Sequence, residues 1–286
     1  MLHLELLVQG VVQGSIYALI ALGLTLVYGL LRVLHVAHAA MFTLGAYLGV
    51  VVTNATGSLP LGCLAATLLC GFAGVALYRL CYEPILHRPP FVALIASIGL
   101  YIAAEEVFRI VFGEFGLSYQ APPLQSRLAA AGIGLKAAEL VVILASAAII
   151  AALAILQRRT RLGIACIASV ADPAMAQSAG IDLRRVRDLV FFVGSALAGY
   201  AGVMVGLLNN LVEPGLGAVP SYKALAIIVL GGLGSTAGAL AASMVLGIVE
   251  SFGTIHLGWL MDRNAIAFAF LIAVLMVRPH GLFARR

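Results

Sequence analysis

Apolar stretches long enough to cross a lipid bilayer follow one another along nearly the whole chain of 286 residues. A hydrocarbon core about 30 Å thick requires about 20 apolar residues in helical form. Such stretches cover residues 6–31, 36–53, 59–82, 91–112, 138–157 and 189–208, followed by a glycine-interrupted region at 222–254 and a last span near 265–277. Their apolar runs are continuous and lack the alternating polarity of barrel strands. The sequence therefore predicts an all-α, polytopic transmembrane helical bundle of eight or nine spans.

The composition agrees, since 63% of the residues are hydrophobic and 10% are charged, against about 45–50% and 25% in a soluble domain. No segment between the spans is large enough for a folded soluble domain, so we expect a single transmembrane domain over residues 1–286. The first apolar run follows no cation and exceeds the core of a signal peptide, so we expect it to remain as the first span.

The cations predict the orientation, because cytoplasmic loops of membrane proteins are rich in Lys and Arg. The segment 158–188 holds six of the seventeen Lys and Arg residues, and we take it as cytoplasmic. With nine crossings the same side holds Arg32, Arg79, Arg88, Arg158, Arg159, Arg161, Arg184, Arg185, Arg187, Arg278, Arg285 and Arg286. The opposite side holds Arg127, Lys136, Lys223 and Arg263, with Arg109 inside a span near it. The N-terminus is therefore predicted outside and the C-terminus in the cytoplasm.

Several classes of protein are not expected. The net charge of +5 is explained by the topology, so a nucleic-acid partner is not needed. The four cysteines form no CxxC pair and have no His at metal-ligand spacing, and no GxxxxGK[ST] phosphate loop is present. We therefore predict no metal, no cofactor and no nucleotide site, and any ATP hydrolysis would belong to another chain.

The basic segment 158–188 contains the signals of a short helix. Asp172 followed by Pro173 is typical of a helix start, and Gly180 is typical of a helix end. Residues 174–179 between them make about two turns. Such a helix suits docking into a groove of a partner, and the alternative is a solvated loop whose arginines only fix the topology.

Sequence motifs along the chain resemble one membrane-protein family. The stretch 172–181, the run ALAGYAG at 196–202 and GLTLVYG at 23–29 resemble permease subunits of branched-chain amino acid ABC importers. Further similarity lies in SIGL at 97–100, VLGGLGS at 229–235 and RPHGLF at 278–283. The family's Asn-Phe-Ala-His-Gly pattern reads HVAHA at 35–39 here, so its Asn and Gly are both replaced. The chain has no long N-terminal extension, and in this it resembles the shorter of the two permeases in such a system.

This resemblance implies a non-catalytic, multi-pass subunit of a bacterial inner membrane. Its implied partners are a sister permease, two cytoplasmic ATPase subunits and a periplasmic substrate-binding protein, and its implied substrate is a branched-chain or related amino acid, urea or a short amide. The resemblance also implies that the helix in the basic loop is the coupling helix that contacts the ATPase. That helix comprises Asp172, Pro173, Ala174, Met175, Ala176, Gln177, Ser178, Ala179, Gly180 and Ile181.

Polar residues inside the spans are candidates for the translocation path, because intramembrane polar groups are costly and usually face the bundle interior. Gln9, Gln13 and Tyr17 lie on one face of the first span; they line a path or join helices by hydrogen bonds. His38 lies with His35 near the expected inner end of the second span, where helix-end hydrogen bonding is favoured over a metal site. Glu250 stands alone in an apolar run and needs a partner.

Two further polar groups are expected at the outer face. Glu105 and Arg109 are at ion-pair spacing near the outer end of the fourth span, beside Glu106, and form a structural pair or an outer gate. Asn209, Asn210 and Glu213 form a polar turn where a binding protein would dock. The glycines within 230–238 interrupt a helix, either as a turn at the cytoplasmic surface or as a break beside the path.

An alternative function is an ion-coupled secondary transporter of small polar solutes. It predicts an essential membrane-embedded acid, such as Glu250 or Glu106, and activity from this chain alone. An intramembrane enzyme is disfavoured, since no Ser/His/Asp or HExxH pattern appears.

Overall fold

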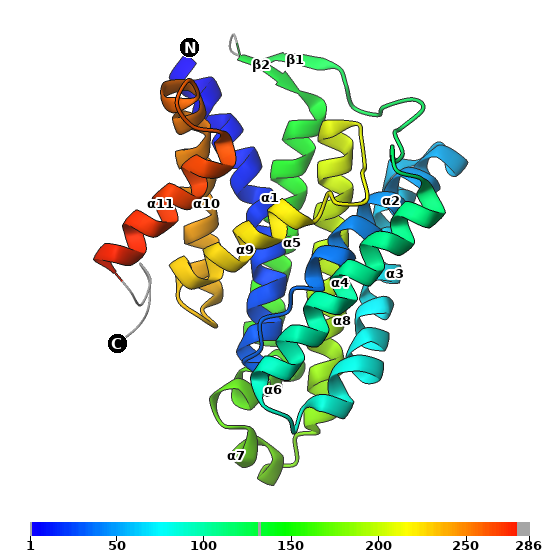
Figure 1. Cartoon of the computed structure of the whole chain (residues 1–286), viewed down its shortest axis with the longest axis vertical. Helices are drawn as coiled ribbons and strands as arrows, with labels where there is room; N and C mark the ends of the chain where they lie inside the picture. The colour runs from blue at the N-terminus through cyan, green and yellow to red at the C-terminus, as the bar shows by residue number, and fades with distance from the viewer. Residues whose placement is uncertain (1, 131–132, 279–286) are drawn as a thin grey trace.

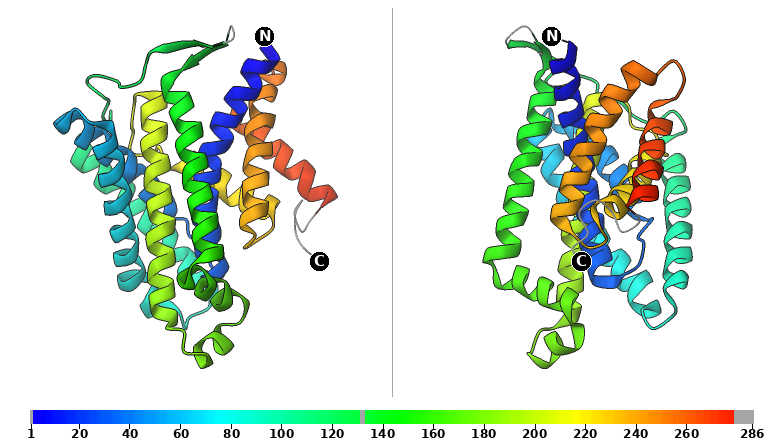
Figure 2. Two further views of the ribbon diagram at one scale, coloured as in Figure 1. Left: turned by 180° about the vertical axis from the view of Figure 1, so that it is seen from behind. Right: turned by 90° about the vertical axis from the view of Figure 1, so that its left-hand side faces the viewer.

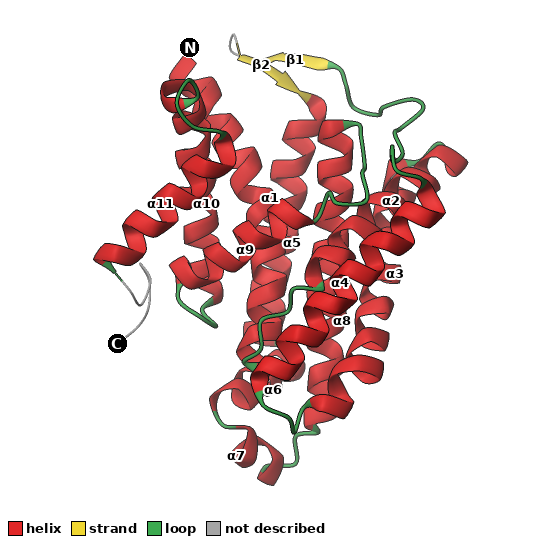
Figure 3. Cartoon of the chain, in the orientation of Figure 1, coloured by secondary structure: helices red, strands yellow, loops and turns green. Residues whose placement is uncertain are grey.

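The computed structural model describes residues 2–130 and 133–278 and is built almost entirely of helices (Figures 1 and 3). The helices of the first half are α1 (Leu2–Leu31), α2 (His38–Thr56), α3 (Leu59–Leu77), the π-helical η1 (Tyr78–Tyr82), the 3₁₀ turn η2 (Glu83–Ile85) and α4 (Pro90–Phe112). The later helices are α5 (Ala137–Arg159), α6 (Arg161–Ala171), α7 (Pro173–Ser178), α8 (Leu183–Asn209), α9 (Ala218–Gly231), α10 (Thr236–Leu257) and α11 (Arg263–Val277).

Seven helical stretches are long and apolar enough to cross a membrane. They confirm the all-α polytopic bundle; the count of eight or nine spans stays a prediction. The two remaining helices of the C-terminal third, α9 with 14 residues and α11 with 15, are shorter. At 1.5 Å per residue each extends about 21–23 Å, less than a hydrocarbon core.

Helices α1 and α8 form the centre of the bundle. Almost all of α8 from Gly194 to Leu207 is buried, while α4 and α5 expose most of their apolar surface on the outside. The close packing depends on small residues, as in other membrane helices. A side chain at Gly45 of α2 would overlap the backbone of Gly199 in α8, so glycine is required at this contact.

Two non-helical segments lie inside the bundle. Residues 32–37 connect α1 to α2, and the start of α2 lies beside the last third of α1, since His38 is next to Gly23. Residues 210–217 connect α8 to α9 in the same manner, and the amide of Gly217 donates to Thr43 Oγ1 at 3.0 Å. Irregular backbone at membrane depth needs such protein partners. His38 is the first residue of α2, and the segment before it packs against α1, so this end of α2 is buried in the bundle.

The glycine-rich region after residue 230 does interrupt a helix. The helix α9 ends at Gly231 and α10 begins at Thr236, with Gly232 and Gly234 at positive φ of 94° and 83°. The turn lies next to Gly29, near the end of α1. It reverses the chain, so α9 and α10 are separate helices (Figure 1).

The opposite ends of the bundle carry different structures (Figure 2). The N-terminus lies at the same end as a hairpin of β1 (Arg127–Ala130) and β2 (Ile133–Lys136), paired antiparallel. The basic segment 158–188 lies at the other end, where it forms α6 as well as α7. The sequence signals predict α7 but not α6. Residues 279–283 of the C-terminal motif, together with Arg285 and Arg286, lie outside the described residues.

Candidate functional site

A cluster of four polar side chains lies inside the bundle, and each comes from a different helix. Tyr17 belongs to α1, Lys223 to α9, Glu250 to α10 and Arg263 to α11. Tyr17 and Lys223 are 2% and 3% exposed, and Glu250 is fully buried. The sequence identified Tyr17 and Glu250 as candidates but left Glu250 without a partner.

The carboxylate of Glu250 is the centre of this cluster. Tyr17 donates its hydroxyl to Glu250 Oε2 at 2.8 Å, and Arg263 donates Nε–H to the same oxygen at 3.1 Å. Lys223 Nζ lies 2.8 Å from Glu250 Oε1 as an ion pair and donates to the Tyr17 hydroxyl at 2.9 Å.

The charges of the cluster do not cancel. One carboxylate faces two cations, which leaves one positive charge over when Tyr17 is neutral. A buried charge is tolerated in a membrane protein only where it is paired or faces a water-filled space. Lys223 is paired with Glu250. The side chain of Arg263 is 43% exposed and so faces the space outside the cluster.

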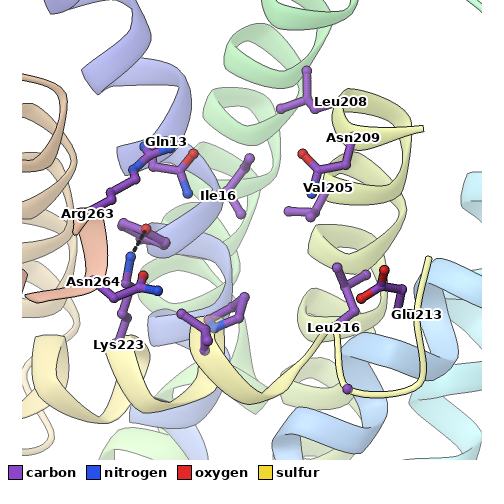
Figure 4. A pocket seen from close by; sticks show the side chains of 14 residues that line it. Gln13, Ile16, Val205, Leu208, Asn209, Glu213, Leu216, Lys223, Arg263 and Asn264 are labelled. Atoms are coloured by element: carbon purple, nitrogen blue, oxygen red, sulfur yellow. Dashed lines mark hydrogen bonds between the residues drawn. The ribbon is translucent and has the colours of Figure 1, made fainter. Parts of the chain in front are cut away.

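The cluster borders a pocket of about 460 Å³ between α1, α8, α9 and α11 (Figure 4). In this view Gln13, Arg263, Asn264 and Lys223 lie on one side, and Asn209 and Glu213 lie on the other. The lining residues of apolar character are Ile16, Val205, Leu208, Leu216, Val219 and Pro220. The pocket thus combines an apolar surface with polar groups of both charges, as small-molecule sites do.

The structure brings together three of the five predicted path residues. Gln13 and Tyr17 line the pocket. Glu250 does not line it but accepts a hydrogen bond from Tyr17. Gln9 lies one turn away, and its amide is 3.5 Å from Glu139 of α5. His38 is buried beside Gly23, where α1 meets α8. Sequence reasoning missed Lys223 and Arg263 as site residues. Counting nine crossings placed both on the side opposite the basic segment 158–188, outside the spans.

The two buried histidines form a separate cluster. His35 Nδ1 is 2.6 Å from the Tyr82 hydroxyl, and its ring lies edge-on to His38 and Phe191. Among the described residues no group of three or more His, Cys, Asp or Glu could hold a metal ion. These contacts tie the segment 32–37 to η1 and α8, which is a structural role.

The predicted coupling segment forms α7. Asp172 caps it, because Met175 N–H donates to Asp172 Oδ1 at 3.0 Å, and Gly180 ends it with φ of 85°. The amide of Ile181 donates to Ala176 O at 3.0 Å. Ala176 is buried, while Met175 is 68% exposed. The helix therefore presents an apolar side chain to the outside of the bundle.

Ion pairs connect the first residues of α8, which follow α7, to η1 and η2. Arg184 Nε lies 2.9 Å from Glu83 Oε1, and Arg79 Nη2 lies 2.7 Å from Asp188 Oδ2. A displacement of α7 would act on α8 directly and on η1 and η2 through these two pairs.

At the other end of the bundle, Arg109 pairs with both Glu106 at 2.6 Å and Glu105 at 3.5 Å. The predicted ion pair is thus present, and it lies on the exposed face of α4. Asn209 and Glu213 of the predicted polar turn line the pocket instead of forming only an outer surface.

Comparison with known proteins gives a match over nearly the whole chain. Residues 6–278 match the family model described as branched-chain amino acid transport system / permease component. The chain is 31% identical to the high-affinity branched-chain amino acid transport system permease protein LivH of Escherichia coli (strain K12), with 99% of this chain and 96% of LivH covered. It is 27% identical to the permease protein LivM of the same strain, with 93% of this chain and 67% of LivM covered.

A solved structure has a similar fold. A chain of PsaBC from Streptococcus pneumoniae in complex with Fab superposes with a TM-score of 0.52 at 12% identity, covering 95% of this chain and 91% of that chain.

Proposed function

The chain belongs to the family of branched-chain amino acid transport system permease components, and from this premise we propose that it is the transmembrane permease subunit of an ATP-driven importer for branched-chain or related amino acids. The observation that carries the proposal is the family match over residues 6–278 together with the full-length similarity to LivH. The permease itself is non-catalytic, and ATP hydrolysis takes place in separate chains.

The proposed complex contains a sister permease, two cytoplasmic ATPase subunits and a periplasmic binding protein, in a bacterial inner membrane. The similarity to both LivH and LivM supports a pair of related permeases, since one organism has both of these proteins. Coverage of 96% of LivH against 67% of LivM supports the role of the shorter partner.

The proposed orientation has the N-terminus outside and the C-terminus in the cytoplasm. It is supported by the position of the N-terminus and the β-hairpin at the end of the bundle opposite α7 (Figure 2). Nine crossings are proposed, in which the short helices α9 and α11 count together with the seven long ones. The short helix α9 completes its crossing with the non-helical backbone of 210–217.

The proposed coupling helix is α7 within the single transmembrane domain. Its support is physical: a capped helix with an exposed Met175 projects from the end of the bundle that carries the arginines of 158–188. The proposed translocation path includes the pocket lined by Gln13 and Tyr17. The other two candidates for the path, Gln9 and His38, lie outside the lining of this pocket.

The alternative of ion-coupled transport by this chain alone requires an acid that can exchange a proton or a sodium ion. Glu250 accepts from Tyr17 and pairs with two cations, so protein groups already occupy its carboxylate. Glu106 lies in an exposed ion pair on the outer face. Neither residue offers the free, membrane-embedded carboxylate that the alternative needs.

The test compares two exposed apolar residues at opposite ends of the bundle. Met175→Glu on α7 and Phe115→Glu, where Phe115 is 91% exposed after α4, are expressed with the partner genes. The expected result is that wild type and Phe115→Glu co-purify with ATPase and sister permease and take up leucine, while Met175→Glu loses the ATPases and uptake. A wild-type chain that purifies alone and still transports would contradict the proposal and favour secondary transport.

A further inference from the structure

The unpaired positive charge beside the pocket points to a specific ligand chemistry. The guanidinium of Arg263 has one hydrogen bond, from Nε to Glu250. Its Nη1 and Nη2 groups have no partner among the described residues, although the side chain lines the pocket. A guanidinium with a free edge is suited to bind a carboxylate through two parallel hydrogen bonds.

We propose that Arg263 and Lys223 form a subsite that binds the carboxylate of an aliphatic amino acid during its passage through the permease. The inference rests on the proposed function for the class of solute and adds where and how this chain holds it. A carboxylate at Arg263 neutralises the excess charge of the cluster. Glu250 stays in place and keeps both cations oriented toward the pocket.

The remaining lining fits the other parts of such a solute. The amides of Gln13 and Asn264 lie on the same side as Arg263 and supply further hydrogen-bonding groups (Figure 4). Glu213 lies across the pocket, so the field inside it runs from a positive to a negative side, which orients a zwitterion with its ammonium toward Glu213. The apolar wall that includes Ile16 and Val205 takes the aliphatic side chain.

The subsite is held rigidly, which a binding site requires. Tyr17 donates to Glu250 and accepts from Lys223, so α1, α9 and α10 fix the positions of the charges. Arg263 is in the first turn of α11, whose start is capped by Asp262 through the amide of Asn264 at 3.4 Å. The backbone of Arg263, which carries the guanidinium, is therefore held in place by the capped start of α11.

The experiment measures binding to the full chain with its sister permease in lipid nanodiscs, without the binding protein. Three probes share one aliphatic skeleton: L-leucine, 4-methylpentanoate with only the carboxylate, and 3-methylbutylamine with only the amine. Labelled leucine is displaced by each probe over a range that reaches millimolar concentrations. The expected result is displacement by leucine and 4-methylpentanoate and none by 3-methylbutylamine.

The variants separate this subsite from a general effect of charge. Arg263→Gln weakens both carboxylate probes by about ten- to hundredfold. Arg109→Gln is the matched control, because its side chain is equally exposed, at 43%, and also pairs with a glutamate; it leaves binding unchanged. Equal displacement by the amine, wild-type affinity in Arg263→Gln, or no saturable leucine binding by wild type would each overturn the subsite.

Uptake of labelled leucine in cells that carry the whole system is measured in parallel. If wild type takes up leucine but shows no carboxylate preference in the binding assay, the subsite is refuted and the proposed function stands. Absence of uptake of every branched-chain amino acid refutes the proposed function as well.

Discussion

Glu250 is the residue on which the interior of this protein depends most. It is fully buried, and among the described residues it is the only carboxylate that forms an ion pair with the buried Lys223. Removing one partner of a buried pair leaves the other charge uncompensated, which costs more than the pair itself contributes. The partners lie 206 and 233 residues from Tyr17 in sequence, so the cluster also joins the two ends of the chain.

We expect Glu250→Gln to destabilise the protein by about 3–5 kcal/mol, because Lys223 then carries an unpaired charge inside the bundle. Adding Lys223→Met to Glu250→Gln should recover most of this loss, since the double variant contains no buried charge at these positions. The measurement is thermal unfolding in detergent. Glu106→Gln, which breaks an exposed pair, is the control and should change little. Equal stability of Glu250→Gln and wild type would show that the pair is not formed.

At the residue scale the sequence predicted which side chains are unusual but not how they combine. Tyr17 and Glu250 were recognisable because polar groups in apolar runs are costly. Lys223 was assigned to the outer surface, since its neighbours gave no sign that the preceding segment 210–217 turns back into the bundle. The pairing of distant residues depends on helix packing, which periodicity does not encode.

The helices themselves show how small residues determine which elements touch. At Gly45 the backbones of α2 and α8 approach so closely that a Cβ would overlap Gly199. A Cβ at Gly99 of α4 would meet no atom within 4 Å, because this position faces outward. Replacement by alanine should therefore be tolerated at Gly99 and not at Gly45.

Gly45→Ala should destabilise the bundle by about 1–3 kcal/mol through overpacking. Gly99→Ala should leave stability unchanged or raise it, because alanine favours the helix over glycine. Thermal unfolding of the two variants beside wild type gives the comparison. Similar shifts in both would mean that α2 and α8 are not in direct backbone contact.

The sequence predicted most elements with nearly correct bounds, since continuous apolar runs and the Asp172 and Gly180 signals are local. It did not predict α6, whose sequence from Arg161 to Ala171 lacks the length of a span and follows directly on α5. It also did not predict the β-hairpin at Arg127–Lys136, because eight residues of modest apolarity give no distinct period.

For the molecule as a whole, the bundle has two chemically different ends. One end carries α7 and the arginines around it, and the other carries the N-terminus and the hairpin. From the excess of arginine at one end, we propose that the bundle is inserted with the arginine-rich end in the cytoplasm. The pocket then opens in the half that contains the N-terminal part of α1.

This orientation is measured with single cysteines at opposite ends. Cys63, Cys70, Cys81 and Cys166, all free, are replaced, and either Ser126→Cys or Ser178→Cys is added, both at exposed positions. In cells that express the chain without its partners, a membrane-impermeant maleimide should label position 126 in intact cells and position 178 only after permeabilisation. The reverse pattern would invert the proposed topology.

The hydrogen bond between Tyr17 and Glu250 also has a consequence for how the protein is made. The two residues are 233 positions apart, and ribosomes add about 5–20 residues per second. The helix α1 therefore enters the membrane on the order of ten to fifty seconds before α10 is synthesised. During that time its polar face with Gln13 and Tyr17 lacks its final partners, and a chaperone or the insertion machinery must shield it. The charged cluster is consequently completed only when the last two helices arrive, so the pocket cannot form on a nascent chain that ends before Arg263.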